Sequence, residues 1–451
     1  MDSRKLCITA AAVALTSPAF AQSTGGNVTL YGRLNGGVDN ASATGSYFNG
    51  TTVGGFGPDH DFKSRTRIFD AVSRLGVRGN EDLGNGLRAV FQIESGLNTN
   101  NGQSVAEANQ YNPSAGTLAS RSTWVGLTSN WGQVLFGRQD VFWGNGTIVQ
   151  TGANYVNTEI PWIEGIGGRV TTGVTRQSNV VSYLTPTVAG FNATFYYSPD
   201  ANASGNLIGS SQESAGPGKN TNARLWAATA RWAGGPLQVQ YDFVNKQNAT
   251  DFASLSVAGS PSQNLQAKVW AHKLGVAWMY QPGGQISLIG THVINAGVTG
   301  FDLTGAQTLK QDTLSVSWEH LISNNVLLLA QAGHMFNARG CDGTAVQGLG
   351  AGISNPTNYT QACLNSSANA YLAGVRYNFS KRTGAYLTWN AIQNGQNQFV
   401  DYGPNSLQVG ATPTSGSTLP GTLQNPGSGG IGVQGKGARV QVLAIGLQHN
   451  F

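Results

Sequence analysis

Charged residues are scarce in this chain. Asp, Glu, Lys and Arg make up only 10% of its 451 residues, whereas they account for about a quarter of an average soluble domain. The formal net charge is +5, and the basic residues are spread along the chain rather than gathered in one stretch. A charge this small and this dispersed argues against nucleic acid as a partner.

Long apolar runs are also missing. After the N-terminal segment, no stretch approaches the roughly 18 consecutive apolar residues of a spanning helix, which excludes a helical membrane protein. The N-terminal segment MDSRKLCITAAAVALTSPAFAQ has two basic residues, an apolar run from Leu6 to Leu15 and the small-x-small triplet at 19–21. That order is typical of a secretory signal peptide. We expect residues 1–21 to be removed and residues 22–451 to form one domain; a short core helix is the alternative.

Catalytic and metal-binding motifs are absent from the sequence. The six histidines show no metal-ligand spacing, and no GxSxG, P-loop or dinucleotide fingerprint occurs. The sequence therefore predicts no enzyme, no cofactor and no metal. A hydrolase site assembled on a barrel wall from distant residues would nevertheless leave no local motif.

Cysteine is nearly absent. Of three cysteines, Cys7 lies in the predicted signal peptide, so Cys341 and Cys363 remain. A pair of cysteines in an exported chain predicts one disulfide. Two free thiols are the alternative.

Short stretches of alternating polarity are abundant. In PLQVQYDFV, apolar residues from Leu237 to Phe243 alternate with polar residues from Gln238 to Asp242, and TLSVSWE and AYLAGVRYNF repeat the pattern. Such alternation is typical of half-buried strands. Sixteen candidate strands begin near these residues: Val28, Ile68, Gly86, Leu118, Gln133, Ser178, Phe191, Ala223, Pro236, Ala267, Gln285, Leu309, Val326, Ala370, Gly384 and Ala438.

The connections between these strands alternate in length. Tight turns such as NWG, AGG, QPGG and SNN alternate with long segments rich in Gly, Ser, Asn and Thr. Short turns on one rim and long loops on the other indicate a transmembrane β-barrel. Aromatic residues lie at or near the tight turns and at the chain end, where an interfacial girdle is expected: Trp131, Trp232, Tyr280, Trp318, Phe379 and Phe451. Hairpin-end core residues of soluble sandwiches are the alternative.

A barrel of this kind is predicted to be hollow. In hydrocarbon a sheet must close on itself to pair every backbone N–H and C=O group. The apolar face then meets lipid or a neighbouring subunit, and Gln, Ser, Thr, Arg and Asn face inward. About sixteen strands leave an aqueous channel.

The third long connection, residues 139–177, differs from the other loops. It carries aromatic and aliphatic residues that include Phe142, Trp143 and Trp162, so it is expected to pack against something. Folded inward, it would narrow the pore and direct its acids, Asp140, Glu159 and Glu164, toward basic wall residues. A lid on the outer surface is the alternative.

Strand alternation also predicts which charges face the lumen. The basic candidates are Arg33, Arg74, Arg78, Arg88, Arg231, Lys273 and Arg376, and the acidic ones are Glu94, Asp242 and Glu319. This excess of basic residues predicts a mild preference for anions. Alternatively, the arginines pair with loop acids and leave little selectivity.

Several segments resemble the general diffusion porins of Gram-negative bacteria, specifically the β-proteobacterial type: NVTLYGRLNGGVD, SRLGVRGNEDLGNGLRAVFQIESGLN, STWVGLTSNWGQVLFGRQ, NVVSYLTPTVAGF and AIGLQHNF. The resemblance covers nearly all of the chain after residue 22. It implies a sixteen-stranded antiparallel barrel, a homotrimer in the bacterial outer membrane and an inward-folded third loop that forms an eyelet.

The resemblance carries three basic wall positions onto this sequence, Arg33, Arg74 and Arg138. Arg138 shares its parity with Val134 and Phe136, so it reaches the lumen only if the chain bends there. Two departures are Asn450, which stands where the family commonly has a basic residue, and a long insertion between residues 393 and 437.

Together these patterns predict an outer-membrane channel for passive diffusion of ions and small hydrophilic solutes, in contact with outer-membrane lipid and lipopolysaccharide. The predicted pore-lining residues are Arg33, Arg74, Arg88, Arg138, Asp140, Glu159 and Glu164. The alternatives are a substrate-specific channel with an aromatic slide, built from Trp124, Tyr31, Tyr196 and Tyr386, and an adhesin or structural barrel.

Overall fold

The structure is a computed structural model. It describes residues 27–44, 62–71, 73–97, 99, 118–142, 176–199, 201, 224–247, 268–298, 307–340, 363–395, 398, 400, 437 and 439–451. Within these ranges no helix is long and apolar enough to cross a membrane. The predicted signal peptide and its boundary at residue 21 lie outside the described residues.

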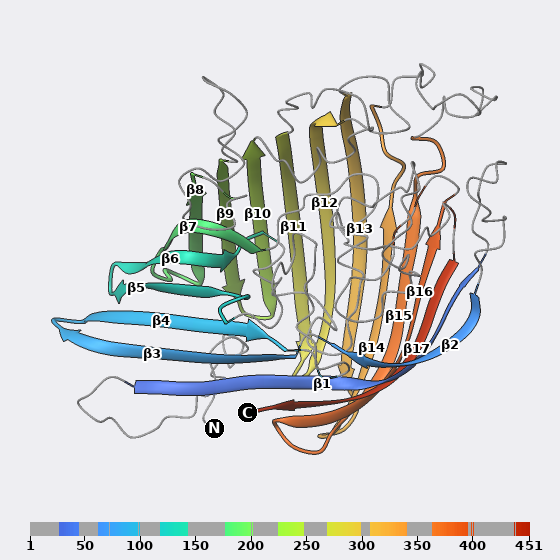
Figure 1. Cartoon of the computed structure of the whole chain (residues 1–451), viewed down its shortest axis with the longest axis horizontal. Coiled ribbons are helices and arrows are strands. Elements are labelled where there is room, and N and C mark those ends of the chain that lie inside the picture. Colours follow the sequence, from blue (N-terminus) through green and yellow to red (C-terminus); the bar gives the residue numbers. More distant parts are fainter. Residues whose placement is uncertain are drawn as a thin grey trace, which may run out of the picture.

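The described residues form strands that pair antiparallel with their neighbours in the chain (Figure 1). Their bounds are β1 (Asn27–Thr44), β2 (Phe62–Asp70), β3 (Arg74–Gly84), β4 (Leu87–Gly96), β5 (Thr123–Ser129), β6 (Gly132–Asp140), β7 (Arg176–Leu184), β8 (Phe191–Ser198), β9 (Leu225–Gly234), β10 (Leu237–Gln247), β11 (Lys268–Gln281), β12 (Gly284–Val298), β13 (Gln307–Leu321), β14 (Val326–Met335), β15 (Ala368–Asn378), β16 (Thr383–Asn394) and β17 (Arg439–Asn450).

The first and last strands close this sheet into a barrel. Strand β1 pairs with β17 along one edge, and with both β2 and β3 along its other edge; Figure 1 shows β17 beside β1 at the bottom of the view. The ladder passes from Gly36 opposite Asp70 to Arg33 opposite Arg74, so β2 and β3 continue one another along β1. Counted as one broken strand, they make a closed sixteen-stranded antiparallel barrel, which confirms the predicted fold.

The break between β2 and β3 has a local cause. The carboxylate of Asp70 accepts hydrogen bonds from the backbone N–H of Ser73, at 3.0 Å, and from the hydroxyl of Thr99, at 2.7 Å. The Ser73 hydroxyl in turn accepts a bond from the Asn35 N–H. These side chains satisfy the backbone where the ladder is interrupted.

Side chains alternate between an outward apolar face and an inward face. On β17, Leu443 and Ile445 are 51% and 60% exposed, while the alternating residues Val442 and Ala444 are buried. The residues predicted for the girdle that stand in or beside turns, Trp131 and Phe379, are exposed. Two other residues predicted for the girdle lie within strands: the indole N–H of Trp318 on β13 donates to the hydroxyl of Tyr280 on β11 at 2.9 Å. Aromatic groups with polar partners suit the headgroup region.

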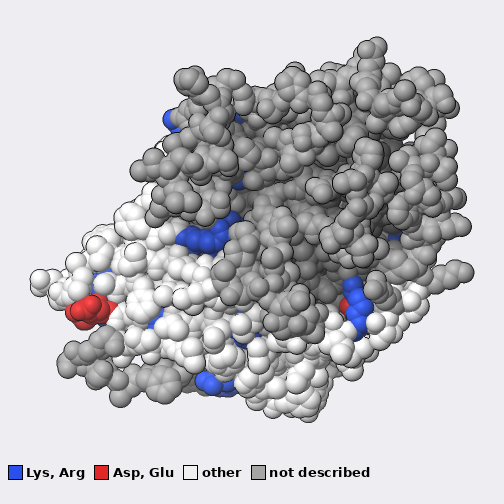
Figure 2. Space-filling view, viewed as in Figure 1, with Lys and Arg blue, Asp and Glu red and all other residues white. Residues whose placement is uncertain are grey.

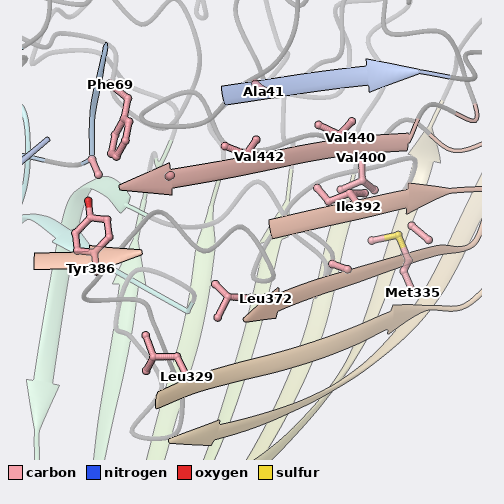
Figure 3. Packing of buried hydrophobic residues seen from close by; sticks show 14 of the residues in the cluster. Ala41, Phe69, Leu329, Met335, Leu372, Tyr386, Ile392, Val400, Val440 and Val442 are labelled. Carbon is pink, nitrogen blue, oxygen red and sulfur yellow. The ribbon is translucent and has the colours of Figure 1, made fainter. Parts of the chain in front are cut away.

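The inner wall is less uniformly polar than predicted. Figure 3 shows an apolar cluster on the inner faces of β14 to β17, with Leu329, Leu372, Ile392, Val440 and Val442 among its members. Buried against them is Val400, from the connection that follows β16; its N–H and C=O both bond the Asn394 side chain at 2.8 Å. This part of the wall faces protein instead of water, which explains its apolar character.

Candidate functional site

Five arginines gather on the inner wall between β1 and β7. With two acids they form what we call the arginine cluster: Arg33, Arg74, Arg121, Arg138 and Arg176 with Glu94 and Asp140. Arg33 and Arg74 are direct cross-strand partners. Arg121, just before β5, is close enough to the other four arginines to interact with each of them electrostatically.

Glu94 on β4 holds one side of the cluster. Its side chain is only 9% exposed, and one carboxylate oxygen accepts a hydrogen bond from Arg121 Nε at 2.6 Å. The other oxygen lies 3.7 Å from Arg74 Nε and accepts a bond from the Tyr31 hydroxyl at 3.1 Å. One acid is thus shared by two arginines, so it neutralises only part of their charge.

Asp140 at the end of β6 holds the other side. One carboxylate oxygen accepts from Arg176 Nε at 2.7 Å, and the other accepts from the Ser122 hydroxyl at 2.8 Å. Asp140 and Arg176 are direct partners in the ladder between β6 and β7. This acid is therefore itself part of the wall, where it pairs with a neighbouring strand; it does not face basic wall residues from an inward-folded loop, as predicted from the sequence.

A bend in β6 brings Arg138 to the cluster. The ladder with β7 shifts register between Gly137 and Gln139. Gly137 has φ +141°, and a Cβ there would come within 2.4 Å of the Thr123 carbonyl oxygen, so only glycine fits. The Arg138 guanidinium donates to the Ser120 carbonyl at 3.2 Å and to the Ser178 hydroxyl at 2.7 Å. The bend that the sequence required for this residue is therefore present.

Positive charge continues along the wall beyond β1. Arg376 on β15 donates to Gln448 Oε1 at 2.8 Å and to Asn378 Oδ1 at 2.7 Å, and its charge acts on Arg33. Tyr386 on β16 lies between them and donates its hydroxyl to Asn35 Oδ1 at 2.6 Å. Figure 2 shows more basic than acidic side chains among the described residues on the face in view.

The start of the third long connection turns inward. Val141 and Phe142, directly after β6, are buried. Lys273 on β11 donates from Nζ to the Phe142 carbonyl at 3.3 Å, and Nζ lies 5.2 Å from the centre of the Phe142 ring. Lys273 itself is paired with Asp242 on β10 at 3.2 Å, and both side chains are fully buried. The chain after β6 thus reaches the inner face of distant strands.

Not every predicted site residue joins the cluster. Arg88 is exposed and lies opposite Asp82 near the β3–β4 turn. It is six residues from the cluster member Glu94 along β4, a separation of about 20 Å. Glu159 and Glu164 lie outside the described residues. Conversely, Arg121 and Arg176 were missed, because they stand at loop–strand junctions where alternation gives no signal.

The structure also bears on cofactors and the disulfide. Within the described ranges, no group of three or more His, Cys, Asp or Glu side chains is placed to hold a metal ion. Cys363 is disulfide-bonded. Cys341, its predicted partner, lies outside the described residues, so the pairing stays a prediction.

Known proteins resemble this chain in both sequence and fold. Residues 9–340 match the family described as Gram-negative porin. The chain belongs to this family. An outer membrane porin protein of Bordetella pertussis is 34% identical over 49% of this chain and 55% of its own length. Outer membrane porin protein 32 of Delftia acidovorans is 32% identical over 44% of this chain and 50% of its own length. The matched region thus spans about half the length of these relatives.

Solved structures support the same fold. The anion-selective porin from Comamonas acidovorans aligns with a TM-score of 0.57 at 20% identity, covering 94% of this chain and 100% of that one. The outer membrane protein OmpT of Vibrio cholerae, described in a trimer form, aligns with a TM-score of 0.54 at 12% identity, covering 95% of this chain and 100% of that one. Family and fold together place this porin in the bacterial outer membrane. Porins are channels rather than enzymes.

Proposed function

We propose that this porin is a passive diffusion channel for ions and small hydrophilic solutes, with a mild preference for anions at the arginine cluster. The observation that carries the proposal is the charge of that cluster. Five arginines face two acids, so the formal net charge is 5 − 2 = +3. A ring of one sign inside a narrow aqueous path raises the local concentration of the opposite ion.

Two features support a constriction near the cluster. The chain enters the barrel at Val141 and Phe142, directly after the cluster member Asp140. Lys273 then binds the Phe142 carbonyl from β11. A loop held between distant strands reduces the free cross-section, and charges on the wall act most strongly where the path is narrow. In this proposal Arg33, Arg74 and Arg138 line the constriction, with Glu159 and Glu164 on the loop.

The anion preference agrees with one structural relative, the anion-selective porin from Comamonas acidovorans. The alternative from the sequence, in which acids cancel the arginines, is less favoured for the described part of the wall, because Glu94 is shared between Arg74 and Arg121. We further propose a homotrimer in contact with outer-membrane lipid and lipopolysaccharide, without catalytic activity. A trimer form is described for OmpT of Vibrio cholerae.

The test is the reversal potential of the reconstituted porin across a tenfold salt gradient. The expected sign is that of an anion-preferring channel, and Arg74→Glu should shift the potential toward cation preference. A clearly cation-selective wild type would refute the charge assignment. Absence of any conductance would instead favour an adhesin or structural barrel.

A substrate-specific channel is the second candidate, and the inner tyrosines do not favour it. Tyr31 and Tyr386 flank the cluster, but their hydroxyls are already bonded to Glu94 and Asn35. Their hydroxyl ends lie close over Gly76 and Gly446, which suggests wall packing rather than a solute slide. Conductance that saturates at low solute concentration would support the specific channel; linear growth with salt would support the general one.

A further inference from the structure

A group of charged side chains lies on the outer wall of the barrel, at the end of the strands opposite the tight turns. We call it the outer basic patch: His292 on β12, Lys310 and Asp312 on β13, and Arg339 after β14. His292 shares the parity of Leu288 on β12, and Lys310 and Asp312 share the parity of Leu314 on β13; both leucines are exposed on the outward face. Arg339 lies on the same side because it is bridged to Lys310. The patch lies outside the barrel and takes no part in the arginine cluster.

Contacts within the patch fix its geometry. Asp312 Oδ1 lies 2.5 Å from His292 Nδ1, and Asp312 Oδ2 accepts a hydrogen bond from the guanidinium of Arg339. Lys310 and Arg339 are opposite one another in an antiparallel bridge, so their side chains lie on the same side. Arg339 is 60% exposed at its side chain, and Lys310 is exposed and makes no side-chain bond within the described residues.

The charge of this surface is positive. Asp312 is the only acid that alternation directs outward on the described strands β10 to β15. It faces Lys310 and Arg339, with Lys268 as a further outward cation at the start of β11. Two cations against one acid in the patch itself leave donors free for an anion.

The height of the patch identifies the kind of anion. His320, which stacks on Trp318 of the aromatic girdle, is ten residues from Lys310 along β13. Ten residues span about 33 Å of strand, which rises about 25 Å at a tilt of roughly 40°. That is the height of the apolar band of an outer-membrane barrel, so Lys310 and Arg339 reach the outer headgroup level.

Apolar and aromatic groups lie directly below and beside the patch. Leu314 and Leu288 are exposed on the outward face of the same strands. Phe336 is exposed, and its ring stands edge-on to the His334 ring, with the two ring centres 4.6 Å apart. A ligand with a phosphate and acyl chains would meet both surfaces at once, whereas free phosphate would meet only the charges.

We propose that the outer basic patch binds the phosphate-bearing headgroup of an outer-leaflet lipid, with Lys310 and Arg339 donating to the phosphate and Asp312 orienting Arg339. Arg and Lys are the side chains that bind phosphate oxygens most strongly. The acyl chains would lie along the apolar band below. The proposal rests on the outer-membrane lipid contact proposed above and is independent of the channel's selectivity, so lipid retention and reversal potential test the two separately.

The test uses the whole purified porin in detergent, incubated with a bisphosphorylated disaccharide lipid or with the same lipid lacking its phosphates. Bound lipid is counted by native mass spectrometry. The wild type should retain the phosphorylated lipid at least fivefold better than the dephosphorylated one, and K310Q/R339Q should lose that difference. Arg439→Gln is the control. It removes another exposed and outward-facing cation, on the distant strand β17, and this variant should bind the lipid as the wild type does. Channel conductance should be unchanged in every variant.

Three results would overturn the proposal. Equal retention of the two lipids would remove the phosphate requirement. Displacement of the lipid by an equal concentration of inorganic phosphate would indicate a free-phosphate site. Loss of lipid only together with loss of the oligomer would indicate that a second copy of the chain covers the patch. If the double variant does not fold, Lys310→Gln alone should still lower retention about threefold, and wild-type retention would refute the assignment.

Discussion

The ring of Phe451 lies directly over Gly32. The two backbones exchange a pair of hydrogen bonds, from Gly32 N–H to the Phe451 carbonyl at 3.0 Å and from Phe451 N–H to the Gly32 carbonyl at 3.1 Å. A Cβ on Gly32 would come within 2.3 Å of the Phe451 ring atom Cζ. This pair therefore seals the seam between the first and last strands, and the ring fits because residue 32 has no side chain.

Substituting Gly32 by Ala should weaken the seam. The added methyl group forces the Phe451 ring off its position, and overpacking of this kind costs about 1–3 kcal/mol. Gly290→Ala is the matched control, since a Cβ there would meet only the Thr313 carbonyl oxygen, at 3.9 Å. The temperature at which the folded barrel loses its fast migration in semi-native electrophoresis should fall for Gly32→Ala alone. An equal fall for both variants would mean that the seam has no special role.

Alternation predicted most of the strands but not their interruptions. Strand β8 begins at Phe191 and β14 at Val326, as predicted. The single strand predicted from Ile68 is divided by the Asp70 turn into β2 and β3, and β2 begins at Phe62, six residues before the predicted start. Strand β5 begins only at Thr123, five residues after Leu118. In both places side chains bond to backbone groups in place of the ladder: Asp70 to Ser73 at the first, and Ser120 to Gly96 and Ser95 to Ala119 at the second. Most of these bonds, unlike the local one from Asp70 to Ser73, join residues more than 20 positions apart, which alternation does not reveal.

The sequence predicted that the inner wall carries more basic than acidic residues, but it did not predict all the residues that form the arginine cluster. Parity directed both Arg33 and Arg74 toward the lumen, and the ladder shows in addition that they are direct partners. Arg176 could not be found from parity, because its position opposite Asp140 depends on a register that only the β6–β7 ladder defines. The inner apolar cluster was also missed, since Val400 reaches it from a connection whose path no strand pattern predicts.

Gly137→Ala should alter ion selectivity through Arg138. The methyl group would clash with the Thr123 carbonyl oxygen and oppose the positive φ, so the bulge would be lost and Arg138 would turn away from the cluster. We expect a shift of the reversal potential toward cations, of the same sign and similar size as for Arg138→Gln. If Arg138→Gln shifts the potential and Gly137→Ala folds without doing so, the bulge does not position this arginine.

Glu94→Gln should have the opposite effect. It removes one of the two acids while keeping the shape of the side chain, so the formal charge of the cluster rises from +3 to +4. The anion-to-cation permeability ratio should increase by roughly a factor of two at low salt, and the increase should shrink at high salt because of screening. A lower ratio would mean that Glu94 supports the arginines structurally rather than offsetting their charge.

The disulfide of Cys363 should connect it to Cys341. Mass mapping of the unreduced, alkylated protein should give one linked pair of peptides, and reduction should separate them. A bridge between these residues closes a loop of about 22 residues, so its loss should cost about 3 kcal/mol of unfolding free energy in the chain-entropy model. Alkylation of Cys341 without prior reduction would contradict the pairing.

Lys273 should both stabilise the barrel and hold the third connection in place. Lys273→Met leaves the Asp242 carboxylate buried; among the described residues, its remaining donors are the Thr229 hydroxyl and the Gln240 amide, at 2.6 and 2.8 Å. An uncompensated buried charge costs about 3–5 kcal/mol, so the variant should unfold at a markedly lower urea concentration. The double variant Lys273→Met/Asp242→Asn removes the charge as well and should recover most of that loss.

The double variant separates the two roles of Lys273. It restores stability but not the bond from Lys273 Nζ to the Phe142 carbonyl, so the start of the third connection loses its attachment to β11. Single-channel recordings should then show more frequent closures and noisier open levels than the wild type, while Lys310→Gln on the outer wall should show neither. Wild-type recordings from a folded double variant would mean that packing around Phe142, rather than Lys273, holds the loop against the wall.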